Sequence, residues 1–239
     1  MERSDNILLP AREGISPRNP EILWQSFSLV FQHMFKNGRE IKLRNDEGAF
    51  ESGMSANDIF LVINGYVTLQ RLNRDGSLVV SSVALPGDII GQATGEIYPW
   101  SAQAVGDTTL RAVPKANFDK VVGENGPMTI ELVKNLENQL QQSRELMAMK
   151  DSLNVTKKVA SFLLWFQKNS QGKSHFKTAT ADFPFSAHRL ASTLGCSREM
   201  ISRSTKTLID LGLISPSRAR KEGAYGILNS ENLKRFIEM

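Results

Sequence analysis

The segment from residue 128 to residue 150 contains no glycine and no proline, and it divides the chain into two unlike parts. A stripe of apolar or small residues recurs in it at steps of three and four: Val133, Leu136, Leu140, Ser143 and Met147. This spacing predicts one long α-helix with a narrow apolar face flanked by charged and amide side chains. Such a face packs either on the helix's own domain or on a second copy, as in a coiled-coil seam.

Before this helix, residues 39–113 predict a series of short antiparallel strands. Asn64-Gly65 and Asp75-Gly76 supply the turn chemistry of tight hairpins, and Val67 and Leu69 keep the alternation of a half-buried strand. Several such signals in series at regular spacing are typical of a small antiparallel barrel or roll.

After the helix and a break near residues 151–154, residues 155–169 predict a second helix rich in large apolar side chains. Two short helices follow around Gly195, and then a hairpin whose basic tip spans residues 217–223. This order is typical of a winged helix-turn-helix. We therefore expect an α+β chain with a β-roll sensor at 1–126, a dimerisation helix at 127–150 and a DNA-binding domain at 151–239.

The charge is distributed unevenly between these parts. Residues 1–150 hold 15 Lys and Arg against 18 Asp and Glu, whereas residues 151–239 hold 14 against 7. A basic terminal domain is what binding to a phosphate backbone requires, although solvated lysines alone give the same count.

The stretch SAHRLASTLGCSREMISRSTKTLIDLGLI predicts a helix-turn-helix. Ser186 and Ser197 are the expected N-caps, and Gly195 suits the turn, where a positive φ is needed. Helical geometry places one set of side chains of the second helix in a buried arc: Met200, Ile201, Ser204, Leu208 and Leu211. The opposite arc carries polar and charged groups, with Ile209 as its one apolar member: Arg198, Glu199, Ser202, Arg203 and Lys206.

The exposed arc has the chemistry of base recognition. Arginine presents a planar fork to the O6 and N7 acceptors of guanine, and glutamate accepts from the N4 amino group of cytosine. Glu199 between Arg198 and Arg203 would be unfavourable beside phosphates, so its presence favours base contacts. The alternative is a solvated face with internal salt bridges.

On these residues the chain resembles the cyclic-AMP receptor / fumarate-nitrate regulator (CRP/FNR) family of bacterial transcription factors. The similarity covers the roll (GMSANDIFLVINGYVTLQRLNRDG and PGDIIGQ), the long helix and LGCSREMISR. It implies that Arg198, Glu199 and Arg203 contact bases as in the receptor branch, while Ser202 is typical of the fumarate-nitrate branch. Ser204 departs from the apolar residue usual at its position.

The resemblance also implies the partners: palindromic promoter DNA, a second copy of the chain through Val133, Leu136, Leu140 and Met147, and RNA polymerase. We expect the DNA-binding set to be Ser197, Arg198, Glu199, Ser202, Arg203 and Lys206.

The effector segment IIGQATGEIYPWSAQAV departs from the cyclic-AMP-binding members, which resemble Gly-Glu followed by Arg-Ser-Ala. Gln92 replaces the glutamate and Trp100 the arginine, and a neutral indole cannot balance a buried phosphate. Glu96 would take the place of the family's glutamate if the loop were shifted relative to its position in those members. Gln92, Glu96, Trp100 and Ser101 remain candidates for a different effector; the other possibility is a protein active without any ligand.

We expect no cofactor, metal or catalytic site. One cysteine excludes a four-thiolate cluster within the chain, and no histidine lies between His33 and His175, where a cupin-type enzyme would need its ligands. Cys196, beside Arg198 at a helix start, is a candidate redox thiol, but a turn cysteine is more usually a small buried residue.

The composition and the N-terminus predict a cytoplasmic protein without a membrane span. A small-molecule-binding roll that acts through protein contacts remains the alternative to a DNA-binding regulator.

Overall fold

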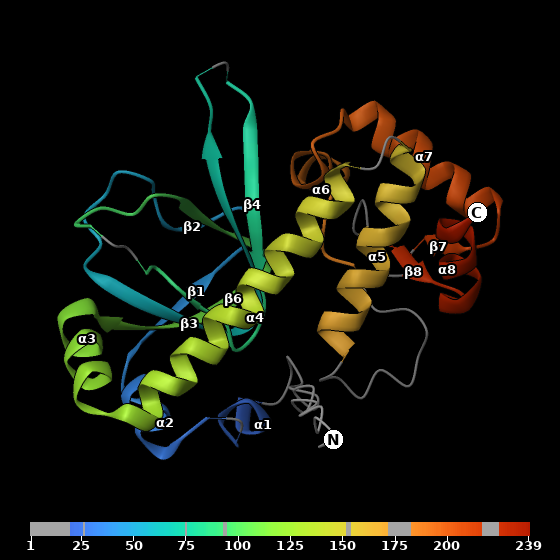
Figure 1. Cartoon of the computed structure of the whole chain (residues 1–239). Coiled ribbons are helices and arrows are strands. Elements are labelled where there is room, and N and C mark those ends of the chain that lie inside the picture. The colour runs from blue at the N-terminus through green and yellow to red at the C-terminus, as the bar shows by residue number, and fades with distance from the viewer. Residues whose placement is uncertain are drawn as a thin grey trace, which may run out of the picture.

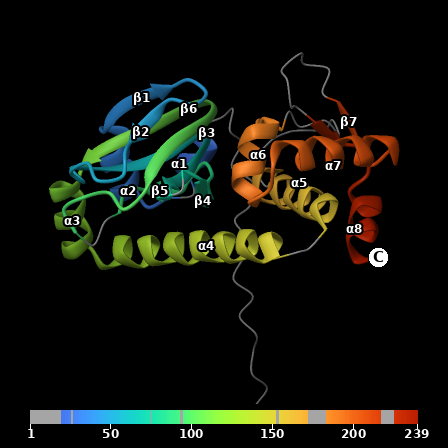
Figure 2. The ribbon, with the colours of Figure 1, turned by 90° about the horizontal axis from the view of Figure 1, so that it is seen from above.

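The computed structural model describes residues 20–25, 27–74, 76–92, 95–151, 154–171, 183–216 and 225–239. It has an N-terminal β-roll and a C-terminal helical domain, and the long helix α4 (Gly126–Asp151) runs past both of them (Figures 1 and 2). This arrangement confirms the α+β class, the N-terminal antiparallel sheet and the C-terminal helix-turn-helix.

The roll is built on one antiparallel sheet. Its strands are β1 (Arg39–Leu43), β2 (Gly48–Phe50), β3 (Asp58–Leu72), β4 (Leu78–Ala84), β5 (Ile89–Ile90) and β6 (Ser101–Pro114). The order is β1-β6-β3-β4, with β2 paired to β6 and β5 to β3. The two long central strands therefore support all the others.

The prediction of a hairpin at Asn64-Gly65 is wrong. β3 continues through this pair, and its register against β6 shifts on both sides of Asn64. Gly65 has a φ of 79°, which a bulge accommodates as well as a turn does, so the strand bends without ending. The second expected turn is a real hairpin, because β3 and β4 pair up to Leu72 and Leu78; Asp75 lies outside the described residues.

Three short helices pack against the roll: α1 (Pro20–Gln25), α2 (Leu29–Lys36) and α3 (Lys115–Glu124). Phe27 stacks on Phe31 at 4.3 Å between ring centroids, and Phe31 contacts Phe35 at 4.8 Å. These rings form one apolar cluster with the sheet and with Met128 at the start of α4. The long helix is thereby anchored to the roll at its N-terminal end.

The C-terminal domain contains α5 (Val155–Gln171), α6 (Ala187–Leu194), α7 (Arg198–Asp210), β7 (Ile214–Pro216), β8 (Tyr225–Ile227) and α8 (Ser230–Glu238). Its centre is an aromatic cluster in which Phe162 contacts Trp165, Phe183 and Phe185 at 5.2–5.8 Å. The expected break before α5 is confirmed, because α4 ends at Asp151 and α5 begins at Val155.

One apolar core crosses the boundary between the two domains. Val83, Leu85 and Val105 of the roll belong to the same buried cluster as the C-terminal aromatic residues. Tyr66 of β3 packs on Phe166 of α5 at 4.8 Å, and burial raises the pKa of its phenol to about 12. The phenol is therefore neutral at physiological pH, as an apolar contact of this kind requires.

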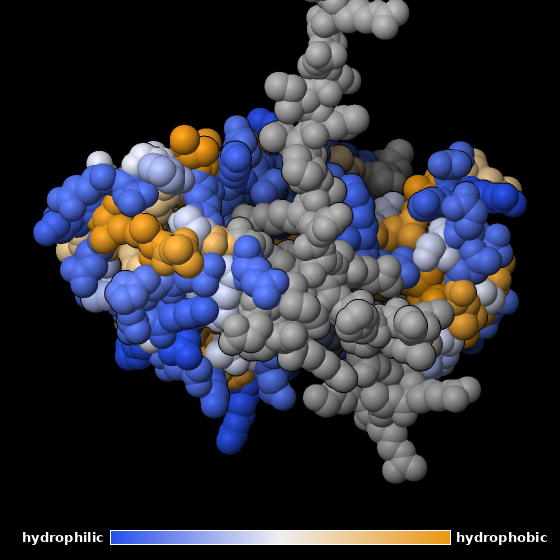
Figure 3. All heavy atoms as spheres, turned by 90° about the horizontal axis from the view of Figure 1, so that it is seen from below, coloured by the Kyte–Doolittle hydropathy of each residue, from blue (hydrophilic) through white to orange (hydrophobic). Residues whose placement is uncertain are grey.

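The described surface is mainly hydrophilic where it is seen from below, and hydrophobic side chains are exposed there in separate patches (Figure 3). None of the helices in the described ranges is long and apolar enough to cross a membrane.

The bulge at Gly65 makes a prediction about stability. An added Cβ at this position would lie 2.4 Å from the Thr108 hydroxyl and 2.5 Å from the Asp107 carbonyl oxygen, whereas at Gly53, also at positive φ, it would meet open space. We expect Gly53→Ala to lower the free energy of unfolding by about 1 kcal/mol and Gly65→Ala by about 3 kcal/mol or more in urea titrations. Equal losses would show that the close approach at Gly65 is relaxed at little cost.

Candidate nucleic-acid interface

The helix-turn-helix has the capping predicted from its sequence. The Ser186 hydroxyl accepts a hydrogen bond from the Arg189 N–H at 3.2 Å, and the Ser197 hydroxyl accepts one from the Met200 N–H at 3.2 Å. Gly195 between them has φ 65° and ψ 42°, the left-handed conformation that ends α6. The angle between α6 and α7 is therefore fixed by local backbone geometry.

α7 presents one polar face to solvent. All six residues predicted to bind DNA are exposed on or next to it: Ser197, Arg198, Glu199, Ser202, Arg203 and Lys206. The opposite face is buried against the C-terminal core through Ile201, Ser204, Thr205 and Leu208.

Two residues of the predicted buried arc are exposed instead. Met200 is 45% exposed and Leu211 is 54% exposed, because the first lies at the edge of the opening turn and the second is the C-cap beyond the last helical residue. Thr205 takes the inner position, since its hydroxyl donates to the Ile201 carbonyl at 3.0 Å and so carries no unpaired polar group into the core.

Two residues of α7, Ser204 and Ile209, depart from the pattern of an ideal amphipathic helix, and both make contacts in the structure. Ser204 is buried, and its hydroxyl accepts a hydrogen bond from the Thr156 hydroxyl of α5 at 3.2 Å, which compensates for the missing apolar contact. Ile209 was the apolar exception on the polar face, and it is half-buried against the C-terminal core. Ile209 therefore does not interrupt the polar face of α7.

Glu199 stays ionised on this face. Hydrogen bonds from its own backbone N–H and from the Ser197 side chain, together with the nearby charges of Arg198 and Arg203, hold the pKa of the carboxyl below its usual value. A carboxylate held in this way is a hydrogen-bond acceptor at neutral pH, as contact with the amino group of cytosine requires.

The hairpin that follows α7 begins as expected. β7 and β8 pair antiparallel, with Ile214 opposite Ile227 and Pro216 opposite Tyr225. The basic tip predicted at residues 217–223 lies outside the described residues.

The long helix α4 uses two opposite faces. On the inner face Asn135 is buried, donating to the Gly87 carbonyl at 2.7 Å and accepting from the Ile89 N–H at 3.2 Å. On the outer face the predicted stripe is exposed, together with Ile130: Val133, Leu136, Leu140 and Met147. The helix thus packs on its own roll through polar bonds at Asn135 and apolar contacts at Met128, and it leaves its apolar stripe without a partner within the described chain.

The effector candidates do not converge on one site. Gln92 donates its amide to the Ile89 carbonyl at 2.8 Å, and the Ser101 hydroxyl accepts from the Ser52 N–H at 2.9 Å. Glu96 is exposed, while Trp100 is half-buried with the Arg71 guanidinium 4.9 Å from its ring centre. The sequence analysis did not foresee this cation, which is exposed and stacks on the indole.

The roll interior near these residues is filled by aromatic rings. Phe50 stacks on Phe60 at 5.2 Å and on Tyr98 at 4.0 Å, and all three side chains are buried. The Tyr98 hydroxyl donates to the Asp58 carbonyl at 2.8 Å. This stack is a close-packed core and not a hydrated cavity.

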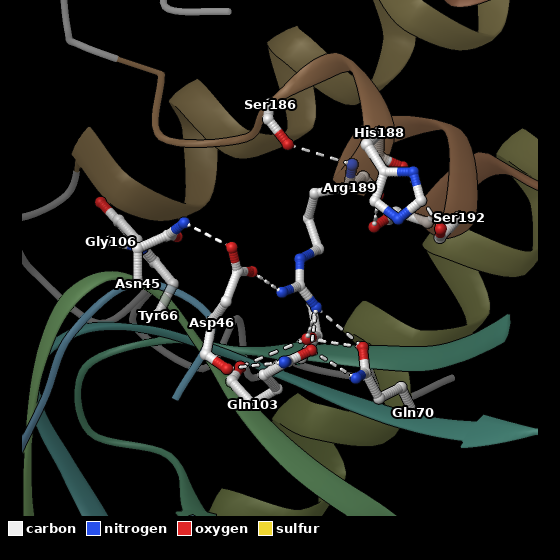
Figure 4. A network of polar contacts seen from close by, with 12 residues as sticks. Asn45, Asp46, Tyr66, Gln70, Gln103, Gly106, Ser186, His188, Arg189 and Ser192 are labelled. Atoms are coloured by element: carbon white, nitrogen blue, oxygen red, sulfur yellow. Dashed lines mark hydrogen bonds and ion pairs between the residues drawn. The ribbon is translucent and has the colours of Figure 1, made fainter. Parts of the chain in front are cut away.

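The sequence analysis missed Arg189, which is 6% exposed on α6 and points into the roll (Figure 4). One of its terminal nitrogens donates to Thr68 at 3.1 Å, Gln70 at 2.8 Å and Gln103 at 2.7 Å, and the other forms an ion pair with Asp46. These partners precede Arg189 by 86 to 143 residues. A local pattern in the sequence carries no signal for contacts at that separation.

Cys196 is half-buried at the start of α7, and its thiol lies 3.5 Å from the Leu194 carbonyl. It packs against the C-terminal core, as the small-residue interpretation expects. His33 and His188 lie on different domains, and His175 is outside the described residues. Among the residues that the structure describes, no three metal-binding side chains come together.

Comparison with known proteins agrees with this architecture. Family models for the Crp-like helix-turn-helix domain and the cyclic nucleotide-binding domain match residues 157–236 and 40–125. The nitrogen fixation regulation proteins FixK of Azorhizobium caulinodans and of Bradyrhizobium diazoefficiens are each 28% identical, over 74% and 77% of this chain and 71% and 76% of their own lengths. The fold is similar to that of FixK2 from Bradyrhizobium japonicum (TM-score 0.72, 22% identity, 83% of this chain and 96% of that chain).

Matches to a cyclic nucleotide-binding domain model and to a Crp-like helix-turn-helix domain model thus follow one another on one chain. The chain belongs to the CRP/FNR family of DNA-binding transcription regulators.

Proposed function

We propose that this regulator acts as a homodimer that binds a palindromic promoter site through α7 of each protomer, and that it does so without cyclic AMP. We assign the sensor role to residues 1–126, dimerisation to residues 127–150 and DNA binding to residues 151–239. RNA polymerase is the expected partner at the promoter.

The observation that carries the proposal is the exposed face of α7. Arg198 and Arg203 flank an ionised Glu199 on a capped helix whose other side is buried. Donors and an acceptor are thus presented together on a rigid element, which suits base contacts in the major groove. Lys206 and the hydroxyls of Ser197 and Ser202 suit contacts to phosphates along the same face.

The exposed stripe on α4 supports the dimer. Two recognition helices reach successive major grooves only when they lie about 34 Å apart, which a two-fold dimer provides. The stripe repeats at coiled-coil spacing over two heptads, and Leu136 and Leu140 are 41% and 50% exposed in the single chain. Pairing with the same helix of a second copy would bury it.

Independence from cyclic AMP is supported by the roll. Neither Gln92 nor Trp100 can balance a phosphate, and the stacked rings of Phe50, Phe60 and Tyr98 occupy the interior. Arg71 is the one cation in contact with Trp100 among the described residues, and its exposed position gives a ligand little shielding from water. A small molecule changes the balance between the active and inactive states of a regulator only if it binds one of them more tightly than the other.

The first prediction concerns base contacts. Arg203→Ala is expected to lose about 1–3 kcal/mol of discrimination between a G·C-containing palindrome and random duplex, with nonspecific affinity almost unchanged. Arg235→Ala, which removes an exposed arginine of α8, is the matched control and should keep full discrimination. The measurement is fluorescence anisotropy over a range of salt concentrations.

An equal loss on specific and random DNA would move Arg203 to the phosphate-contacting class. If the unmodified protein showed no salt-dependent DNA affinity, the proposal would fail, and a roll that acts through protein contacts would replace it.

The second prediction concerns assembly. Leu136→Glu with Leu140→Glu should give monomers in analytical ultracentrifugation and little affinity for the palindrome, because charged side chains would face each other across the seam. Leu72→Glu changes an equally apolar residue, 67% exposed at the end of β3, and should leave a dimer. A dimer that survives both α4 changes would place the interface elsewhere.

The third prediction concerns the ligand. Isothermal calorimetry with cyclic AMP at physiological concentration should detect no binding, and cyclic AMP should leave the affinity for the palindrome unchanged, because the phosphate would lack a buried cation. Micromolar binding would contradict the proposed mode of action, while DNA binding without any additive would support a protein that is active in the absence of ligand.

A further inference from the structure

The strongest polar link between the two domains is a single buried side chain. Arg189 leaves the helix-turn-helix and donates to three neutral acceptors of the roll, on Thr68, Gln70 and Gln103 (Figure 4). Its fourth acceptor, Asp46, is 60% exposed, so water screens the ion pair. The geometry of the contact is therefore set mainly by the neutral acceptors, of which Thr68 and Gln70 are buried and Gln103 is half-buried.

The acceptors are also held by hydrogen bonds within the roll. The Gln103 amide donates to the Asp46 carbonyl at 2.7 Å, and the Gln70 amide donates to the Gln103 side chain. Asp46 itself is held at a φ of 70° by the turn between β1 and β2, where the Asn45 side chain accepts from the Gly106 N–H at 2.9 Å. The four partners thus form a socket for one guanidinium that is linked by hydrogen bonds of its own.

The other end of the link is equally fixed. The backbone N–H of Arg189 donates to the Ser186 cap, and its carbonyl accepts from the Thr193 hydroxyl at 2.8 Å. From there α6 leads to α7 through the Gly195 turn and the Ser197 cap. A tilt of the recognition helix relative to the roll would therefore pull against the guanidinium in its socket.

Among the described residues, most of the other contacts between the roll and the C-terminal domain are apolar and have little directional preference; the hydrogen bond between the Tyr66 hydroxyl and the Ser170 side chain is a polar exception. Val83, Leu85 and Val105 pack against the C-terminal core, and such packing attracts two surfaces without fixing one angle between them. Planar hydrogen bonding by a guanidinium does fix an angle.

We propose that Arg189 is a positioning residue: it holds the helix-turn-helix at one orientation on the roll, so that a dimer presents its two α7 helices at the spacing of the palindrome without a ligand. This inference rests on the proposed function. In this account the contacts of Arg189 within the chain order the DNA-binding domain, a role that an effector would otherwise have.

The test distinguishes the spacing between the two recognition helices from the base contacts that each helix makes. A palindrome is first selected from a pool of random duplexes by the unmodified protein. Arg189→Met is then compared with the unmodified protein on this palindrome, on versions with one base pair added or removed between the half-sites, and on a single half-site. Arg39→Met is the matched control, since it removes an arginine–aspartate ion pair that stays within the roll.

Arg189→Met should bind the single half-site as well as the unmodified protein does, because its α7 face is intact. It should bind the palindrome about tenfold or more weakly and lose most of the preference for one spacing, because a loosely held second helix has a lower effective concentration. Arg189→Lys should recover part of this preference through a single ammonium donor. Arg39→Met should behave as the unmodified protein.

Unchanged affinity and spacing preference in Arg189→Met would overturn the inference. So would an equal loss on half-site and palindrome, which would show a defect in the helix-turn-helix itself. If Arg189→Met did not fold, Arg189→Lys would decide by the same two comparisons. Failure of the unmodified protein to select any palindrome would instead contradict the proposed function.

Discussion

The contact between the β-roll and the helix-turn-helix determines where the recognition helix lies. An apolar core that includes Leu85 and Val105 of the roll joins the domains, and Arg189 adds directional hydrogen bonds to roll acceptors. Without this contact the DNA-binding domain would be attached through α4, by the junction between α4 and α5 and by packing around Leu146. A tethered domain can bind one half-site, but cooperative binding to two requires a defined separation.

The features predicted from sequence are those that depend on neighbouring residues. Caps at Ser186 and Ser197 and the left-handed Gly195 have local causes, and all three were predicted in place. The stripe of α4 was also predictable, because helical periodicity determines which residues share a face.

The features that sequence reasoning missed depend on distant partners. The sequence Asn64-Gly65 is compatible with either a tight turn or a β-bulge, and only the pairing of β3 with β6 determines which of the two forms. Met200 follows the apolar spacing, but the described elements leave it 45% exposed at the edge of the first turn of α7. Arg189 appears in the sequence as an ordinary charged helix residue; its burial results from acceptors that lie far away along the chain.

The central claim is that the two recognition helices hold one separation in the absence of any ligand, and a spin-label distance measurement tests it directly. Cys196→Ser removes the one cysteine of the chain, and Asp210→Cys places a label at the exposed end of α7, away from the base-contacting turn. The account predicts one narrow distance distribution for the free dimer, unchanged when the palindrome is added. A broad distribution that narrows only with DNA or with a small molecule would contradict it.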